Sequence, residues 1–140
     1  MASVPWTTYN MDAILKSATG RALTAVGLML EGAAARLSPV GQYPKGSGRV
    51  GGRLRGSITH AVASGGSTPK NPAKAGDAVS RPTDDVTLHV GTNVEYAPHV
   101  EYGTVRMRAQ PFLRPALDNN RKAMQALYAQ ELQRGLRDGK

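Results

Sequence analysis

An apolar stripe at helical spacing predicts one long helix over residues 10–37. Thr8 or Asn10 can accept hydrogen bonds from the free N–H groups of the first turn, and Pro39 disfavours helix just beyond the end. Much of the stripe is alanine and three glycines lie within the helix, so we expect a neighbouring element to approach it closely. The stripe consists of Ile14, Ala18, Ala22, Val26, Met29, Ala33 and Leu37.

Two shorter stretches alternate apolar with polar residues and predict strands over residues 54–64 and 85–92. In the first strand, Ile58, His60 and Val62 would share one face. The second alternates more cleanly, with its apolar residues pointing one way. Residues 40–53 and 64–84 are rich in glycine and basic residues, so we expect flexible basic loops there. Residues 1–9 are expected to form an N-terminal arm.

A second apolar face predicts a C-terminal helix that ends near Leu136. Pro115 must lie in its first turn, because proline has no N–H to donate further along a helix. The chain is therefore expected to be a single α+β domain over residues 1–140. It would comprise the long N-terminal helix, a small, mostly antiparallel sheet with long loops, and the C-terminal helix packed on the sheet. The C-terminal face consists of Leu113, Leu117, Met124, Leu127, Tyr128, Leu132 and Leu136.

The composition indicates a thin core and narrows the possible chemistry. With 140 residues the chain suits one domain, but it has a single Phe and a single Trp. Such a core is common in subunits that their neighbours complete. Cysteine is absent, which excludes disulfides, thiolate zinc sites and cysteine nucleophiles. Glycine, glutamate and arginine interrupt the apolar stretches before about 20 residues, so we expect no membrane span and a cytoplasmic origin.

The net charge of +8 is concentrated in one part of the chain. Between residues 45 and 81 there are seven basic residues and one acid, Asp77. Such a patch suits DNA, an anionic surface or an acidic protein partner, and it equally suits a solvated loop. The candidate DNA- or partner-facing residues are Lys45, Arg49, Arg53, Arg55, Lys70, Lys74 and Arg81.

The motifs that usually carry catalysis are missing or out of context. Residues 46–51 match a dinucleotide-binding fingerprint formally, but they follow a helix instead of a buried strand. The histidines, His60, His89 and His99, have no acid or histidine at metal-ligand spacing. There is no nucleophile elbow and no phosphate-binding loop with a Gly-Lys-Ser/Thr ending. We therefore expect no enzyme activity, no cofactor and no metal.

The densest segment of the sequence is 96–115, YAPHVEYGTVRMRAQPFLRP. We expect Gly103 to adopt a positive φ and Thr104 to bond to local backbone, fixing a turn. Glu101 is expected to be partly buried and paired with one of the arginines at 106, 108 and 114. Phe112 would anchor the last helix. The segment can be read as a structural turn or as a subunit contact, and the two interpretations are compatible. The candidate structural or interface residues are Glu101, Tyr102, Gly103, Thr104, Pro111, Phe112 and Pro115.

Two patches of sequence resemble the small neck and tail-completion proteins (tail components, head–tail connectors) of long-tailed bacteriophages. The first patch is Ser38-Pro39-Val40 followed by Gly52-Arg53-Leu54-Arg55-Gly56-Ser57-Ile58. The second is Val90-Gly91-Thr92, Tyr96-Ala97, Val100-Glu101-Tyr102-Gly103-Thr104 and Gln110-Pro111-Phe112-Leu113-Arg114-Pro115-Ala116-Leu117.

The resemblance implies a virion structural protein, made in the bacterial host cytoplasm, in the neck or head-proximal tail. It implies a subunit of a neck or tail-completion ring, expected to be a hexamer, that joins or finishes the tail without catalysis. Its partners would be copies of itself and neighbouring connector, terminator or tail-tube proteins, with possible contact to DNA in the channel and none to a membrane. A tail terminator or head-closure ring protein of the same connector is an alternative. From another class, a basic nucleic-acid-binding module would show DNA affinity that falls steeply with salt.

Overall fold

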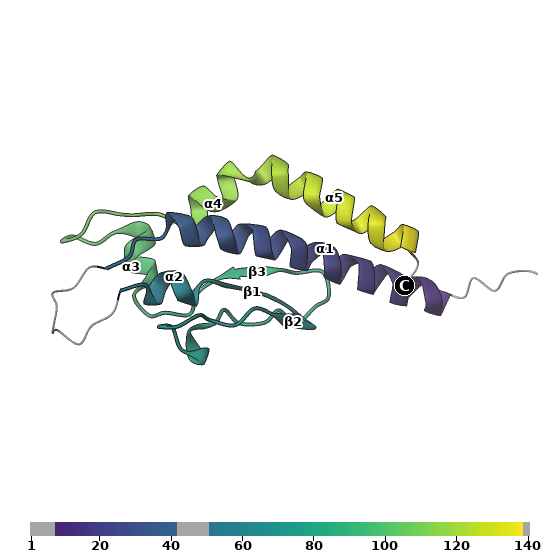
Figure 1. Cartoon of the computed structure of the whole chain (residues 1–140), viewed down its shortest axis with the longest axis horizontal. Coiled ribbons are helices and arrows are strands. Elements are labelled where there is room, and N and C mark those ends of the chain that lie inside the picture. Colours follow the sequence, from purple (N-terminus) through teal and green to yellow (C-terminus); the bar gives the residue numbers. More distant parts are fainter. Residues whose placement is uncertain (1–7, 42–50, 139–140) are drawn as a thin grey trace, which may run out of the picture.

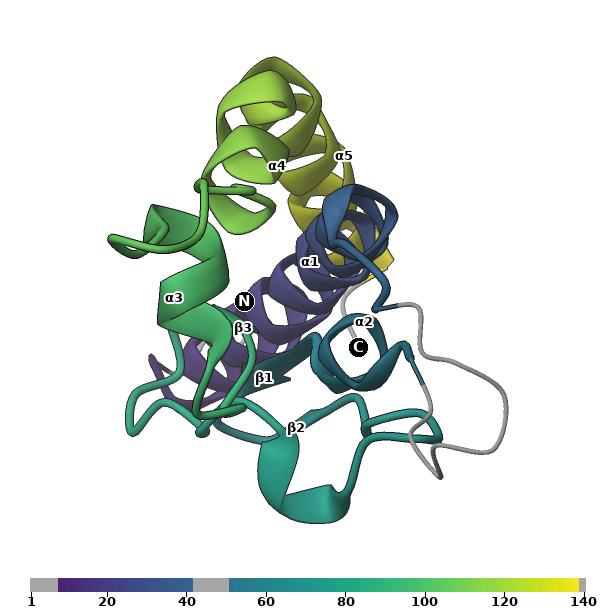
Figure 2. The ribbon, with the colours of Figure 1, turned by 90° about the vertical axis from the view of Figure 1, so that its left-hand side faces the viewer.

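The computed structural model describes residues 8–41 and 51–138, and side chains within residues 13–41 and 51–137. Helix α1 (Thr8–Leu37) runs along the molecule as its central element (Figure 1). Helices α4 (Leu113–Asn119) and α5 (Arg121–Asp138) lie on one side of α1, and a small sheet lies on the other (Figure 2). The predicted α+β class is therefore confirmed.

The sheet has three short antiparallel strands in the order β2-β1-β3. Strand β1 (Thr59–Val62) pairs with β2 (Gly65–Gly66) through a tight turn, and with β3 (His89–Gly91) on its other edge. Two short helices flank the sheet, α2 (Arg53–Ser57) and α3 (Ala97–Tyr102).

Residues 64–84, the second predicted loop, contain β2 and the 3-10 turn η1 (Ala75–Asp77) but otherwise no regular element. Backbone bonds attach this segment to the rest of the molecule. The N–H of Lys70 donates to the carbonyl of Gly56, and the N–H of Asn93 donates to the carbonyl of Asp77. The remaining predicted loop, residues 40–53, lies mostly outside the described residues, as does the N-terminal arm.

The C-terminal helix was expected to pack on the sheet, and that expectation is wrong. Helix α5 packs along α1, and its main contacts are with α1 and not with the strands (Figure 2). The element is also two helices, because the chain breaks at Asn120. The Asn120 side chain donates to the carbonyl of Ala116 at 2.7 Å, a local bond that competes with a continuous helix. Pro115 lies in the first turn of α4, as its chemistry requires.

Both predicted strands are shorter than expected. The first begins with helix α2 in place of extended chain, and Gly52 before it has φ 98°. In the second, the Asp84 side chain accepts the N–H of Val86 at 3.0 Å, which forms a local turn and leaves Val86 exposed. Every residue of β1 is buried, so both faces of this strand are covered. Helix α1 covers one face of β1, and residues 67–79 lie near it on the other, where Thr59 accepts the N–H of Val79.

The predicted close approach to α1 is confirmed at two glycines. A Cβ added to Gly27 would lie 2.9 Å from the His60 ring, so β1 sits directly on the helix. A Cβ added to Gly135 of α5 would lie 2.8 Å from the Cβ of Ala18. Small residues thus let α1 pack between two layers. Its buried residues are Ala18, Ala22, Val26, Gly27, Leu30, Ala33 and Ala34, whereas Leu37 of the predicted stripe is exposed.

Replacing Gly20 and Gly27 separately by alanine is expected to change stability in opposite directions. A Cβ at Gly20 meets nothing within 4 Å, so G20A gains the helix propensity of alanine, about 0.5–1 kcal/mol. A Cβ at Gly27 must displace His60, so G27A should lose about 1–3 kcal/mol. Urea unfolding measures both changes. Equal effects of the two substitutions would contradict the tight contact between α1 and β1.

Helix α1 is long and apolar enough to cross a membrane over Ala13–Leu37, judged by length and composition, with a mean hydropathy of 1.2. This corrects the expectation that glycine and charged residues interrupt every apolar stretch too early. Core helices and signal sequences pass the same test. Here α1 packs against α5 on one side and β1 on the other, and 28% of the apolar stretch is buried within the chain.

Candidate interaction surface

Glu101 links the two halves of the 96–115 segment. Its carboxylate accepts three backbone N–H groups at the start of α4: Phe112 at 2.8 Å, Leu113 at 3.1 Å and Arg114 at 3.0 Å. First-turn N–H groups have no partner within a helix, so an acid that caps them stabilises the helix start. The acid was predicted to pair with an arginine side chain, and the structure corrects its partner to the backbone of α4.

The environment of Glu101 favours its charged form. Burial raises the pKa of this carboxyl, but the hydrogen bonds from Phe112, Arg114 and Leu113 and the nearby Arg114 charge outweigh burial. The pKa of Glu101 therefore lies below its ordinary value.

Phe112 is the anchor that the sequence predicted. Its side chain is fully buried in a cluster contributed by α1, α2, α3 and α4. Of the two flanking prolines, Pro111 is exposed and Pro115 is half-buried in α4. The other buried members of the cluster are Ala33, Ala34, Leu54, Ile58, Val94, Ala97 and Ala116.

Residues 103–110 form a tightly bonded loop that extends beyond α3 (Figure 1). Thr104 and Met107 exchange backbone bonds of 2.8 and 3.3 Å, and the Thr104 hydroxyl accepts the N–H of Arg106. Gly103 has φ 78°, and a Cβ there would lie 2.7 Å from the nitrogen of Ala109. The predicted roles of Gly103 and Thr104 are thus confirmed. We call this segment the 103–110 loop.

The 103–110 loop and its base present large apolar side chains to solvent. Val105 is fully exposed at the tip, and Tyr102 at the base is 76% exposed. The side chains of Arg106 and Arg108 are exposed as well, and neither makes a hydrogen bond or ion pair within the described structure. The 96–115 segment therefore combines a buried anchor, Phe112, with an exposed tip at Val105.

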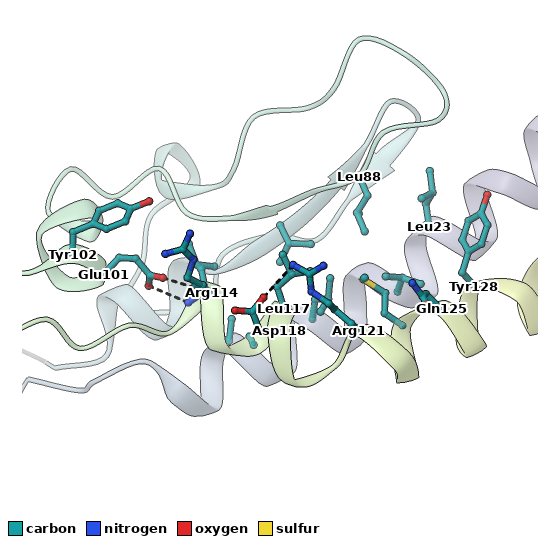
Figure 3. Close-up of a pocket in the computed structure, with 17 residues that line it drawn as sticks. Leu23, Leu88, Glu101, Tyr102, Arg114, Leu117, Asp118, Arg121, Gln125 and Tyr128 are labelled. Atoms are coloured by element: carbon teal, nitrogen blue, oxygen red, sulfur yellow. Dashed lines mark hydrogen bonds and ion pairs between the residues drawn. The ribbon is translucent and has the colours of Figure 1, made fainter.

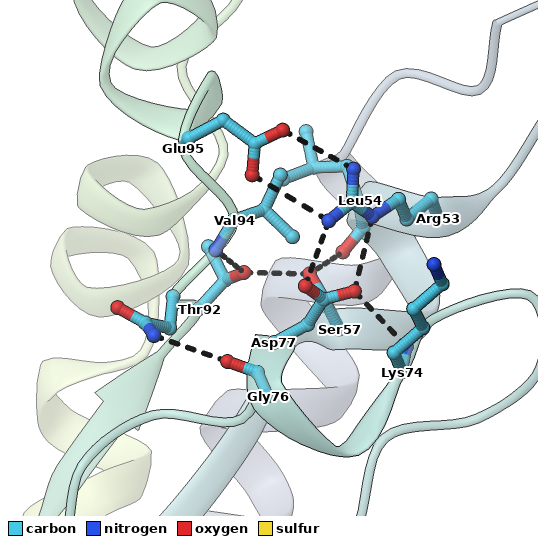
Figure 4. Close-up of polar contacts among 10 residues, drawn as sticks. Arg53, Leu54, Ser57, Lys74, Gly76, Asp77, Thr92, Val94 and Glu95 are labelled. Atoms are coloured by element: carbon cyan, nitrogen blue, oxygen red, sulfur yellow. Dashed lines mark hydrogen bonds and ion pairs between the residues drawn. The ribbon is translucent and has the colours of Figure 1, made fainter.

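Arg53, a predicted surface contact, is instead the centre of an internal network (Figure 4). Its guanidinium donates two bonds to Asp77, at 3.0 and 2.9 Å, and approaches Glu95 at 3.3 Å. It also lies 5.9 Å from the centroid of the Tyr96 ring. The hydrogen bond with Asp77 raises the pKa of Arg53, and the same bond lowers the pKa of Asp77, whose side chain is buried. The network joins α2, η1 and the start of α3.

The other basic candidates with described side chains, Arg55, Lys70, Lys74 and Arg81, are all exposed, but they differ in their contacts. Arg55 donates to the carbonyls of Ala35 and Ser38 at the end of α1, which suits the negative end of a helix. Lys70, Lys74 and Arg81 are exposed. Lys45 and Arg49 lie outside the described residues.

An open apolar groove of about 780 Å³ separates α4 and α5 from β3 (Figure 3). Leu88 approaches from the sheet side, Leu23 from α1, and Leu117 and Tyr128 from α4 and α5. Tyr102 and Glu101 lie at the end next to α3. Since Leu117 is also 39% exposed, the predicted C-terminal apolar face is only partly covered within one chain.

A Ser-His-Glu cluster joins α1 to β1 and was not anticipated from sequence. Glu31 lies 2.6 Å from Nδ1 of His60 and accepts the hydroxyl of Ser67 at 2.8 Å. Ser67 in turn accepts the backbone N–H of His60. Its hydroxyl bonds to the carboxylate and not to the imidazole, so no base is positioned to activate it as a nucleophile. The cluster therefore supplies hydrogen-bond partners to the polar groups that are buried where α1 contacts β1.

The sequence did not predict the two acidic partners of Arg53. Asp77 was noted only as the single acid of the basic stretch, and Glu95 gave no signal at all. Their contact with Arg53 spans 24 and 42 residues of sequence. Among the residues that the structure describes, no group of three or more histidine and acidic side chains is placed to hold a metal ion.

Comparisons with known proteins returned no relative. No protein-family model, curated protein or solved structure gives a significant match to this chain. The resemblance to phage neck proteins therefore rests on the motif residues alone. The structure places several of these residues around Glu101 and Phe112.

Proposed function

We propose that this chain is a structural protein of a tailed-phage virion, a subunit of a neck or tail-completion ring at the head–tail junction that joins or finishes the tail. The observation that carries the proposal is the open apolar groove along α4, α5 and β3, with apolar side chains exposed beside it. Apolar surface of this kind marks protein–protein contacts. A thin core rich in alanine, with apolar surface left open, suits a subunit that its neighbours complete.

The motif residues of the resemblance support the proposal by the way they are used. The capping of α4 by Glu101 ties the Glu-Tyr-Gly-Thr motif to the Pro-Phe-Leu-x-Pro-Ala motif. Gly103 and Thr104 then shape the 103–110 loop, and Phe112 fixes it to the core. These residues build a rigid support with a protruding loop, which is a means of contact and not of catalysis.

The proposed mechanism is geometric. Copies of the chain form a ring, proposed to be a hexamer, and each copy presents the same loops to the rings above and below. Repetition around a closed ring multiplies weak contacts into a stable junction. The neighbours would be connector, terminator or tail-tube proteins, with DNA passing through the channel and no membrane involved. A tail terminator or head-closure ring of the same connector would use the same design.

Two measurements test the proposal together. Native mass spectrometry and sedimentation of the purified chain should show a closed oligomer whose population rises with concentration. Immunoblotting of purified particles of the phage that encodes the chain should find it in the virion, and electron microscopy should place it at the junction. A chain that stays monomeric at all concentrations and is absent from particles would rule the proposal out.

The exposed basic residues favour a second candidate function, that of a nucleic-acid-binding module. Lys70, Lys74 and Arg81 are exposed and lie on one segment of the chain. A joint K70A/K74A/R81A variant would then lose DNA affinity, and the dependence of affinity on salt would flatten. Arg53 and Arg55 are unsuitable for this test, because their internal contacts would also be lost. Little DNA affinity in the wild type would favour the ring.

A further inference from the structure

We propose that the 103–110 loop is the docking element for an acidic protein partner, a chain different from this one, with an apolar recess that receives Val105. The inference deepens the proposed function and rests on it, because it assigns one contact of the ring to a neighbouring component. It concerns the surface between rings and leaves the contact between copies to other faces.

The loop is ordered before any partner binds. The paired bonds between Thr104 and Met107 close its tip, and the N–H of Gln110 donates to the carbonyl of Val100 at its base, at 2.8 Å. The backbone approach at Gly103 leaves no room for a side chain. A loop already held in one conformation loses little entropy on binding, so its contacts convert efficiently into affinity.

The tip has the chemistry of a protein anchor. A folded chain gains nothing by holding a valine fully exposed on a rigid turn, and Val105 is fully exposed. Tyr102 at the base adds a second exposed apolar surface. Exposed apolar surface marks protein–protein contacts, and tyrosine and arginine are the side chains enriched among those that carry binding energy. DNA recognition relies mainly on contacts to phosphates, which an aliphatic tip cannot make.

The positive charges of Arg106 and Arg108 beside the tip indicate that the partner surface is acidic. Arg106 and Arg108 flank Met107, and their side chains have no acid to pair with in the described structure. The acid nearest in sequence, Glu101, is already engaged by the N–H groups of α4. Two unpaired guanidinium groups beside an apolar tip complement a recess with an acidic rim.

A second copy of this chain is a poor match for that requirement. The chain carries a net charge of +8, and nearly all of its carboxylates with described side chains are engaged. Among those carboxylates, Glu131 alone makes no hydrogen bond or ion pair. The engaged carboxylates are Glu31, Asp77, Asp84, Asp85, Glu95, Glu101 and Asp118.

Photocrosslinking in the assembled particle tests the partner directly. A photoreactive amino acid is placed at Val105, and a matched control is placed at Val86, which is also exposed but precedes β3. The expected result is an adduct at position 105 to an acidic segment of another virion protein, absent from the control. An adduct to a second copy of this chain, to DNA or to nothing beyond the control would overturn the proposal.

A binding measurement on the purified chain needs no particle. The probes are a fluorescent peptide of glutamates around central leucines and two matched peptides, with glutamine for glutamate or serine for leucine. V105S should weaken binding of the first peptide about tenfold or more, as expected for an anchor that loses its burial. R106A/R108A should weaken it and reduce its salt dependence, and V86S should not. Equal binding by the wild type and V105S, or preference for duplex DNA, would contradict the inference.

The two proposals fail in different ways. Absence of the chain from rings and particles removes the proposed function, whatever the peptide result. Presence in particles with a Val105 adduct to its own copy removes the docking inference and leaves the ring in place. Val105 is fully exposed, so its variants should unfold at the same urea concentration as the wild type, which separates loss of binding from loss of folding.

Discussion

Phe112→Ala is expected to lower the free energy of unfolding by about 3–5 kcal/mol, the cost of deleting a buried aromatic side chain. Phe112 is the only phenylalanine of the chain and is fully buried. The other buried members of its cluster are four alanines together with Leu54, Ile58 and Val94. The alanine side chains are too small to fill the cavity that removal of the ring would leave. The loss is large compared with a total stability of about 5–15 kcal/mol for a domain.

Urea unfolding of F112A against the wild type measures this loss. If F112A does not fold, F112L keeps part of the volume and should show a smaller loss of the same sign. V105A is the matched control, because it removes apolar atoms from a fully exposed site and should change stability by less than about 0.5 kcal/mol. A similar cost for F112A and V105A would show that Phe112 is not the anchor of the α4 junction.

Glu101→Ala is expected to cost about 2–3 kcal/mol at neutral pH, since three N–H groups at the start of α4 lose a charged acceptor. The loss also frees the backbone that places Phe112 in the core. E101Q keeps a carbonyl acceptor without the charge, so its cost should lie between those of the wild type and E101A. E131A is the control, because Glu131 has no partner in the described structure.

The Glu101 effect should depend on pH in a definite direction. The pKa of Glu101 is lower in the folded chain than its ordinary value of 4.5, so the unfolded chain binds the proton more tightly. The stability that Glu101 contributes is therefore fully present above about pH 4.5 and is lost as the pH falls through the folded pKa. The gap between wild type and E101A should close in acid. A gap that widens in acid would contradict the capping role.

The sequence predicted best where a local rule decides the structure. The predicted start of α1, residue 10, lies within two residues of its observed start, Thr8, and the end that Pro39 predicted, Leu37, is the observed end. Gly103 needed a positive φ and has one, and Pro115 could enter a helix only in its first turn. These outcomes depend on the backbone chemistry of single residues, and distant contacts do not change them.

Local patterns failed where another bond was available. Alternation over residues 85–92 predicted a longer strand, but Asp84 formed a turn with Val86 before the strand could begin. The apolar face of the C-terminal segment predicted a helix against the sheet, although such a face indicates burial without naming what covers it. The +8 charge predicted cations that face a partner, yet Arg53 and Arg55 bond to groups of the same chain.

The sequence by itself determined the α+β class, the two terminal helical regions and the importance of the 96–115 segment, because periodicity, proline and glycine act through neighbouring residues. Only the tertiary structure decided that Glu101 caps α4, that Arg53 meets Asp77 and that α5 lies on α1. Those contacts join residues 11 to more than 100 positions apart, and no local pattern specifies which groups will meet. By occupying Glu101 with backbone N–H groups, the fold leaves Arg106 and Arg108 unpaired beside an exposed valine, where a partner can use them.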